Sequence, residues 1–137
     1  MQASDAEIGR IKATEKCVLH AYQDGGGVWT IGYGCTGPNV KQGMTITQVQ
    51  AVAMLTAKVR EFDDQVNRAI TVSLNQNQYD ALIDFTYNAG IGNLVRSGIA
   101  GAVNSGDLTK AAHLLATSCT KDRDGVTEPG LVSRRRA

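Results

Sequence analysis

Hydrophobic residues recur every three or four positions along most of this chain, a spacing that predicts amphipathic helices. The first such segment begins after Ser4 or Asp5, either of which can cap a helix. Its apolar positions include Ile8 and Ile11, and Glu15 falls on the same stripe if the helix continues that far. The sequence thus predicts a short helix that carries a carboxylate toward its apolar side.

The pattern changes over residues 18–46, where glycines interrupt β-branched and aromatic residues. Such punctuation is typical of short antiparallel strands joined by tight turns. We predict strands at Leu19–Gln23 and Val28–Gly34, and a third, weaker strand near Met44–Thr45. A small, glycine-rich sheet is therefore expected.

Two capping boxes mark the starts of the longest helices. Thr47 and Gln50 open an apolar-periodic segment that contains no glycine or proline and continues to Ile70, which predicts a helix of about twenty residues. Asn75 and Gln78 open a second segment, which is strongly hydrophobic. We expect this second helix to form the centre of the larger lobe.

Shorter helices are predicted beyond it. Residues 91–103 fit a pair of helical pieces broken by glycine, and Ser105–Asp107 caps a further amphipathic helix. Pro129 stands where a last helix can begin, and the segment ends at Ala137 about two turns later. We therefore expect a shortened final helix.

Composition restricts the class of protein. A chain of 137 residues is long enough for one core, so we predict a single domain, 1–137. We also expect the protein to be a monomer. A net charge of +1 gives no field that would favour nucleic acid as a partner. The amino-terminal segment is polar, and we expect neither a signal peptide nor a membrane anchor in it.

The three cysteines, Cys17, Cys35 and Cys119, are widely spaced and lack a C-x-x-C motif or a histidine at ligand spacing. Neither a disulfide framework nor a zinc site is supported. We expect reduced thiols, with a single bridge such as Cys17–Cys35 as the alternative, and no metal or cofactor.

Two carboxylates in contrasting settings suggest glycoside hydrolysis, which needs one carboxyl group that donates a proton and another that stays ionised. Glu15 suits the first role because an apolar surrounding disfavours the ionised form. Asp24 suits the second because it lies in a polar turn beside Gly25–Gly27. Two carboxyl groups roughly 6.5–9.5 Å apart would indicate an inverting enzyme, and about 5–5.5 Å a retaining one.

Thr30 lies six residues beyond Asp24, across the predicted hairpin, where its hydroxyl could hold the attacking water. Spacing alone does not decide the matter, because a chain with 13 acidic residues readily places a Glu and an Asp nine apart. Glu15 also fits a solvated residue at a helix end.

The complete string around these residues is more specific. It reads E-x-x-x-L-x-A-Y-x-D-x-x-G-x-x-T-I-G-Y-G from Glu15 to Gly34. Further along the chain come I-T-x-x-Q, F-T-Y-N-A-G, N-S-G-D and P-G-L-x-x-R-R. Together these motifs resemble the phage-type lysozymes, the endolysins of glycoside hydrolase family 24.

By that resemblance the fold is α+β and mostly helical, with a small β-hairpin lobe near residues 15–46 and a larger helical lobe, 47–137, flanking a cleft. Glu15 would be the proton donor, Asp24 the residue that positions water, and Thr30 the third catalytic residue. The substrate would be the β-1,4 bond between N-acetylmuramic acid and N-acetylglucosamine in bacterial peptidoglycan.

The resemblance also implies substrate-binding roles for Tyr87 and Asn88, and more weakly for Ser97 and Thr36, which equally fit capping or turn residues. A tyrosine at the end of a hydrophobic helix equally fits a core residue. Such a protein would be made in the host cytoplasm and act on periplasmic peptidoglycan during lysis, by an export route that the sequence leaves open.

Two other functions remain as alternatives. A lytic transglycosylase would use Glu15 alone and form an anhydro sugar, and a non-catalytic module would only bind peptidoglycan. The basic run Arg134–Arg136 fits a solvated charge cluster, with contact to Glu15 or to the sugar cleft as the alternative.

Overall fold

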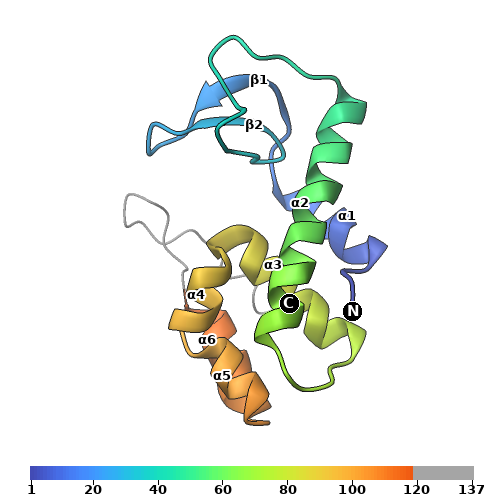
Figure 1. Ribbon diagram of the computed structural model, residues 1–137, viewed down its shortest axis with the longest axis vertical. Coiled ribbons are helices and arrows are strands. Elements are labelled where there is room, and N and C mark those ends of the chain that lie inside the picture. The colour runs from blue at the N-terminus through green and yellow to red at the C-terminus, as the bar shows by residue number, and fades with distance from the viewer. Residues whose placement is uncertain (119–137) are drawn as a thin grey trace. The chain divides into compact units, whose positions relative to one another are not determined.

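The computed structural model describes residues 1–118, so the expectations for Cys119, Pro129 and Arg134–Arg136 lie outside the described residues. Helices dominate the described part, and one small antiparallel sheet lies near its start (Figure 1). The predicted mostly helical α+β class is confirmed. In chain order the elements are α1 (Asp5–Thr14), β1 (Val18–Gln23), β2 (Trp29–Gly32), α2 (Gln48–Ala69), α3 (Gln76–Ala89), α4 (Ile91–Arg96), α5 (Ile99–Asn104) and α6 (Leu108–Thr117).

The chain divides into two compact units. The first, here called the β unit, is Asp5–Arg60 and contains α1, both strands and the first part of α2. The second, the helical unit, combines Met1–Ser4 with the described residues from Glu61 to residue 118. The β unit therefore includes helical segments on both sides of the small lobe expected at residues 15–46. Whether 1–137 acts as a single domain stays a prediction.

The sheet is a hairpin in which Tyr22 pairs with Thr30 and Gln23 with Trp29. β2 ends earlier than predicted, at Gly32, because Gly32 and Gly34 adopt φ of 65° and 80° and the chain turns back on itself there. In place of a third strand, an isolated bridge joins His20 to Thr45.

Both predicted capping boxes are present. In the first, the Gln50 amide donates to Thr47 Oγ1 at 3.2 Å and the Thr47 amide donates to Gln50 Oε1 at 2.8 Å. In the second, Asn75 and Gln78 make the same reciprocal bonds at 2.8 and 3.0 Å. These bonds satisfy amides that a helix start otherwise leaves without partners, so α2 and α3 begin where predicted.

The glycine-broken segment forms two short helices, as expected. Gly98, at φ 88°, separates α4 from α5, and a side chain there would meet Leu114 of α6 at 3.6 Å. The Asp107 carboxylate then caps α6 by accepting from the Lys110 amide at 3.0 Å. A glycine with positive φ and a capping aspartate thus mark the boundaries of these short helices.

Each unit has its own group of buried apolar residues. In the β unit they are Ile11, Ile31, Tyr33, Cys35, Val40, Ala51, Leu55 and Val59. In the helical unit they are Ala3, Val66, Tyr79, Leu82, Ile83, Phe85, Leu94, Ile99, Ala100, Ala102, Val103 and Ala111. Most of them come from the periodic positions of the predicted helices, so burial of these faces provides the main stabilising free energy.

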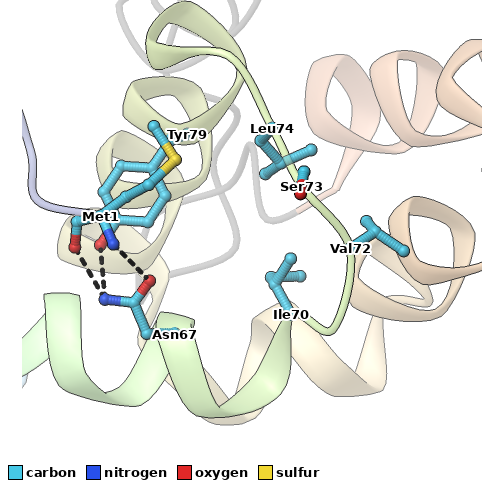
Figure 2. A pocket seen from close by; sticks show the side chains of 7 residues that line it. All are labelled: Met1, Asn67, Ile70, Val72, Ser73, Leu74 and Tyr79. Atoms are coloured by element: carbon cyan, nitrogen blue, oxygen red, sulfur yellow. Dashed lines mark hydrogen bonds between the residues drawn. The ribbon is translucent and has the colours of Figure 1, made fainter.

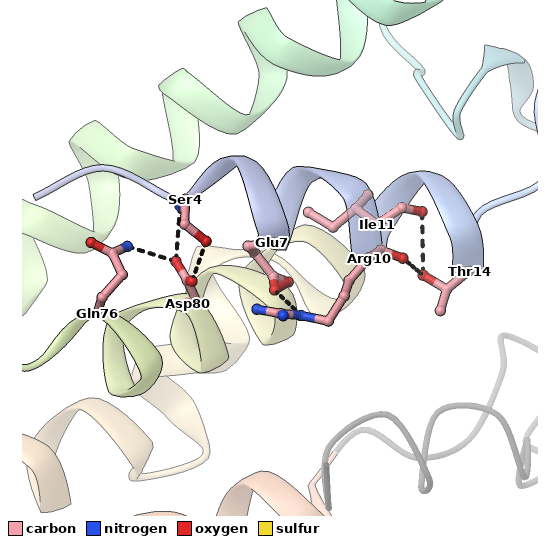
Figure 3. Close-up of polar contacts among 7 residues, drawn as sticks. All are labelled: Ser4, Glu7, Arg10, Ile11, Thr14, Gln76 and Asp80. Atoms are coloured by element: carbon pink, nitrogen blue, oxygen red, sulfur yellow. Dashed lines mark hydrogen bonds and ion pairs between the residues drawn. The ribbon is translucent and has the colours of Figure 1, made fainter.

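Asp80 of α3 holds the amino-terminal residues of the helical unit (Figure 3). Its carboxylate accepts from the Ser4 amide at 3.0 Å, from the Ser4 hydroxyl, and from Gln76 Nε2 at 2.8 Å. Only 3% of Asp80 is exposed. A buried carboxylate is tolerated there because several donors compensate its lost hydration.

Asp63 of α2 makes a second contact of this kind. It accepts from the Ala3 amide at 2.9 Å and from the Tyr79 hydroxyl at 2.6 Å. Nearby, Asn67 Nδ2 donates to the Met1 carbonyl at 2.7 Å (Figure 2). A cavity of about 300 Å³ opens beside these groups and contains none of the predicted site residues; it is lined by Met1, Asn67, Ile70, Val72, Ser73, Leu74 and Tyr79.

Replacing Asp80 with alanine should lower the free energy of unfolding by about 2–3 kcal/mol, because the donors of Ser4 and Gln76 would lose a buried acceptor. Urea unfolding followed by circular dichroism measures this loss. Asp64→Ala, an exposed position on α2, is the matched control and should change stability by less than about 0.5 kcal/mol. Equal losses in the two variants would contradict the role given to Asp80.

Candidate active site

The hairpin brings two of the three predicted catalytic residues together. Asp24 directly follows β1, and Thr30 is the second residue of β2. Thr30 pairs with Tyr22, two residues before Asp24. The five residues between Asp24 and Thr30 therefore belong to one tight turn and the start of β2, as the sequence predicted.

Asp24 organises that turn with its side chain and its backbone. Its Oδ1 accepts from the amides of Gly26 at 2.8 Å and Val28 at 3.0 Å. Its backbone amide donates to the Val28 carbonyl and its carbonyl accepts from the Gly27 amide, both at 2.9 Å. The half-buried carboxylate consequently has a fixed position relative to β2.

Thr30 is buried, with 4% of its surface exposed. Its hydroxyl donates to the Val28 carbonyl at 3.0 Å. Because the hydroxyl proton is directed at that carbonyl, the Thr30 oxygen is oriented as an acceptor toward any other group.

Glu15 lies one residue beyond the end of α1. Its amide still donates to the Ile11 carbonyl at 2.8 Å, so the helical register extends to this residue. At the end of the helix, the Thr14 hydroxyl donates a hydrogen bond to the Arg10 carbonyl at 2.9 Å (Figure 3). Glu15 is half-buried, in agreement with a place on the same stripe as Ile11.

Gly34 lies against the Glu15 carboxylate. A Cβ added at Gly34 would be 3.6 Å from Glu15 Oε2, and Gly34 itself has a φ of +80°. The turn that follows β2 therefore reaches the carboxylate that precedes β1. All three predicted catalytic residues belong to the β unit.

The predicted substrate-binding residues are divided between the two units. Thr36 is exposed in the β unit, whereas Tyr87, Asn88 and Ser97 belong to the helical unit. Tyr87 is half-buried and packs edge-to-face on Phe62, with ring centroids 5.8 Å apart. That contact gives Tyr87 a packing role in α3.

Ser97 has a capping role. Its hydroxyl donates to the Leu94 carbonyl at 3.3 Å and accepts from the Ile99 amide at 3.4 Å, which joins the end of α4 to the start of α5. Its substrate-binding role stays a prediction, as do those of Thr36, Tyr87 and Asn88.

Gln48 and Tyr33 are two residues that the sequence did not single out. Gln48 Nε2 donates to the Tyr33 hydroxyl at 2.8 Å, and the Cys17 thiol donates to Gln48 Oε1 at 3.6 Å. The only signal in the sequence was the place of Tyr33 between Gly32 and Gly34. Cys17 and Cys35 form no disulfide with each other, and within residues 1–118 no three His, Cys, Asp or Glu side chains gather as a metal site.

Comparison with known proteins identifies the family of the chain. The family model for phage lysozyme matches residues 12–137. The chain belongs to the phage lysozyme family. Lysozymes are glycoside hydrolases, so the predicted resemblance and enzyme class are confirmed.

Individual relatives cover the chain throughout. The endolysin of Bacillus phage PZA is 39% identical over 98% of the chain, which spans 52% of that protein. The endolysin of Acyrthosiphon pisum secondary endosymbiont phage 1 is 37% identical over the whole chain and 94% of its own length. Among solved structures, the endolysin from Escherichia coli O157:H7 phage FAHEc1 matches with a TM-score of 0.85 and 39% identity, over 99% of this chain and 89% of that one. In the part of the chain described, no helix is both long and apolar enough to cross a membrane.

Asp24→Asn and Asp24→Ala should differ in stability. Asparagine keeps a side-chain oxygen that can accept hydrogen bonds from the amides of Gly26 and Val28. Alanine removes this acceptor from both amides. We expect Asp24→Ala to lower the free energy of unfolding by about 1–2 kcal/mol and Asp24→Asn by less than half of that. Urea unfolding of both variants tests this, and an equal loss would show that Asp24 does not hold the turn.

Proposed function

We propose that this chain is a muramidase that hydrolyses the β-1,4 bond between N-acetylmuramic acid and N-acetylglucosamine in bacterial peptidoglycan. The observation that carries the proposal is the hairpin: its turn fixes Asp24 beside Thr30, and the chain beyond its second strand meets Glu15 at Gly34. Membership of the phage lysozyme family supports the choice of substrate.

In the proposed reaction Glu15 is the general acid. Its carboxyl group donates a proton to the glycosidic oxygen as the bond to the anomeric carbon breaks. The leaving sugar departs as an alcohol and Glu15 is left as a carboxylate. A water molecule then supplies the hydroxyl group to the anomeric carbon and a proton to a base, so the reaction adds one water across the bond.

Asp24 and Thr30 would orient that water. The Thr30 hydroxyl already donates to the Val28 carbonyl, so the water would donate a hydrogen bond to Thr30 Oγ1. The other O–H of the water would donate a hydrogen bond to the Asp24 carboxylate. A carboxylate has about four acceptor sites, so it can accept this bond in addition to those from two amides. With both protons engaged, the oxygen lone pair would face the anomeric carbon.

The biological setting follows from the substrate. We propose that the protein acts as a monomer, without a cofactor, on the periplasmic peptidoglycan of a host cell and thereby lyses it. Tyr87 and Asn88, from the last turn of α3, would contribute sugar contacts. The family name and the endolysin relatives support this setting.

Hydrolysis of purified sacculi by the wild-type chain and by Glu15→Gln tests the proposal. Loss of the general acid should reduce the rate by about 10²–10⁴-fold with little change in stability. Asp24→Asn and Thr30→Val should also be slow, whereas Thr30→Ser, which keeps the hydroxyl, should retain most activity. Mass spectrometry of the released fragments should show reducing muramic acid ends.

Other outcomes identify the alternatives. Anhydro ends, together with an active Asp24→Asn variant, would mean a lytic transglycosylase. Binding to sacculi without release of fragments would mean a non-catalytic module. Full activity of Glu15→Gln would remove Glu15 from its role.

Gly34→Ala offers a milder perturbation of the acid. A methyl group there would contact Glu15 Oε2 at about 3.6 Å and cover one side of the carboxyl group. We expect kcat/KM to fall by roughly tenfold, equivalent to about 1.4 kcal/mol of transition-state stabilisation. The matched control is Gly43→Ala, which has the same backbone strain at φ +84° but no atom within 4 Å. Comparable activity in the two variants, measured on sacculi, would show that Gly34 matters only for folding.

A further inference from the structure

One side chain in the β unit connects the two chain segments that meet at the proposed acid. Gln48, the first residue of α2, donates to the Tyr33 hydroxyl at 2.8 Å through Nε2. Its Oε1 accepts from the Cys17 thiol at 3.6 Å, a longer distance that the size of sulfur allows. Because a thiol is a weak donor, the bond to Tyr33 is the stronger of the two.

The bridged residues are neighbours of Glu15 and Gly34. Cys17 comes two residues after Glu15, in the short connection between α1 and β1 that is neither helix nor strand. Tyr33 comes directly before Gly34, the residue whose added Cβ would lie 3.6 Å from Glu15 Oε2. The amide of Gln48 therefore joins the segment that carries the acid to the segment against which the acid lies.

Gln48 can act as an anchor because its own backbone is held. The capping box of Thr47 and Gln50 fixes the start of α2 on either side of it. The next turn of the helix also lies against the hairpin, since a Cβ at Gly32 would be 3.7 Å from the Ala51 side chain. Tyr33 is 6% exposed, so its ring is fixed by packing.

We propose that Gln48 is a positioning residue for Glu15. With the bridge in place, the connection that follows Glu15 has one position relative to Gly34, and so does the carboxyl group. Proton donation requires a donor and acceptor within about 2.6–3.2 Å, so a looser connection makes productive geometry less frequent. This inference rests on the proposed function, in which Glu15 is the acid.

Steady-state kinetics on soluble, uncross-linked glycan strands tests the inference. Gln48→Met keeps the length of the side chain but removes both hydrogen bonds, and it should lower kcat about tenfold with KM within about twofold. Gln48→Glu keeps acceptors for the Tyr33 hydroxyl and the Cys17 thiol and should restore most of kcat. Gln42→Met, an exposed glutamine of the same unit, is the matched control and should behave as wild type.

A double-mutant cycle separates positioning from folding. Tyr33→Phe removes a single oxygen and keeps the packed ring, so it tests the same bond even if Gln48→Met does not fold. If both act through one bond, the double variant should be no slower than the worse single variant. Three results would each overturn the inference. They are additive losses of kcat in the double variant, a wild-type kcat in Gln48→Met or in Tyr33→Phe, and a raised KM at unchanged kcat.

Glu15→Gln distinguishes the two levels of the proposal. If Glu15→Gln is inactive while Gln48→Met and Tyr33→Phe are normal, only the positioning role fails. If Glu15→Gln remains active, the proposed acid itself is wrong, and the role of Gln48 fails with it.

Discussion

The candidate site depends on a turn that Asp24 holds through its carboxylate and its backbone. Asp24 Oδ1 accepts hydrogen bonds from two amides of the loop between β1 and β2, and the Asp24 backbone makes two more bonds within that loop, just before β2 begins. An isolated two-stranded hairpin is only marginally stable in water, so the turn geometry cannot be left to the strands alone. Without Asp24, the position of Thr30 relative to β1 would be less well defined.

Packing against α2 provides the rest of the support. Gly32 lies against Ile46 and Ala51, at distances where a larger residue would contact their side chains. The positive φ values of Gly32 and Gly34 then turn the chain back toward Glu15. A short strand with glycine at its end thus serves two purposes: it packs closely on a helix and it leaves space for a carboxyl group.

Local chemistry made much of this fold predictable. The capping boxes at Thr47 and Asn75 join residues only three positions apart, and a single glycine separates α4 from α5. Such local patterns can be recognised in the sequence without a structure. The Asp24 turn was expected for the same reason. Glu15 was also placed on the correct stripe, although α1 ends one residue before it.

Contacts between distant residues were not predictable. Asp63 and Asp80 accept hydrogen bonds from backbone amides that lie 60 and 76 residues away in the sequence. Neither aspartate has a local sequence pattern that distinguishes it from a solvated residue on a helix. Gln48 is similar, because a glutamine at the start of a helix is ordinary until Tyr33 and Cys17 are seen beside it. Such residues emerge only when the chain is folded, since their function depends on partners that sequence spacing does not specify.

Stability and the proposed chemistry are coupled most strongly at Asp24. The two amides that hold the turn also favour the ionised form of the carboxylate, which is the form that can accept a proton from water. The structural bonds and the proposed catalytic role therefore require the same charge state and do not compete. Glu15 is placed differently, because its backbone amide continues the helical register by donating to the Ile11 carbonyl and its carboxyl group lies beside Gly34. The proposed water-positioning residue thus holds a turn through its carboxylate, whereas the proposed acid lies at the end of a helix, against a glycine of the hairpin.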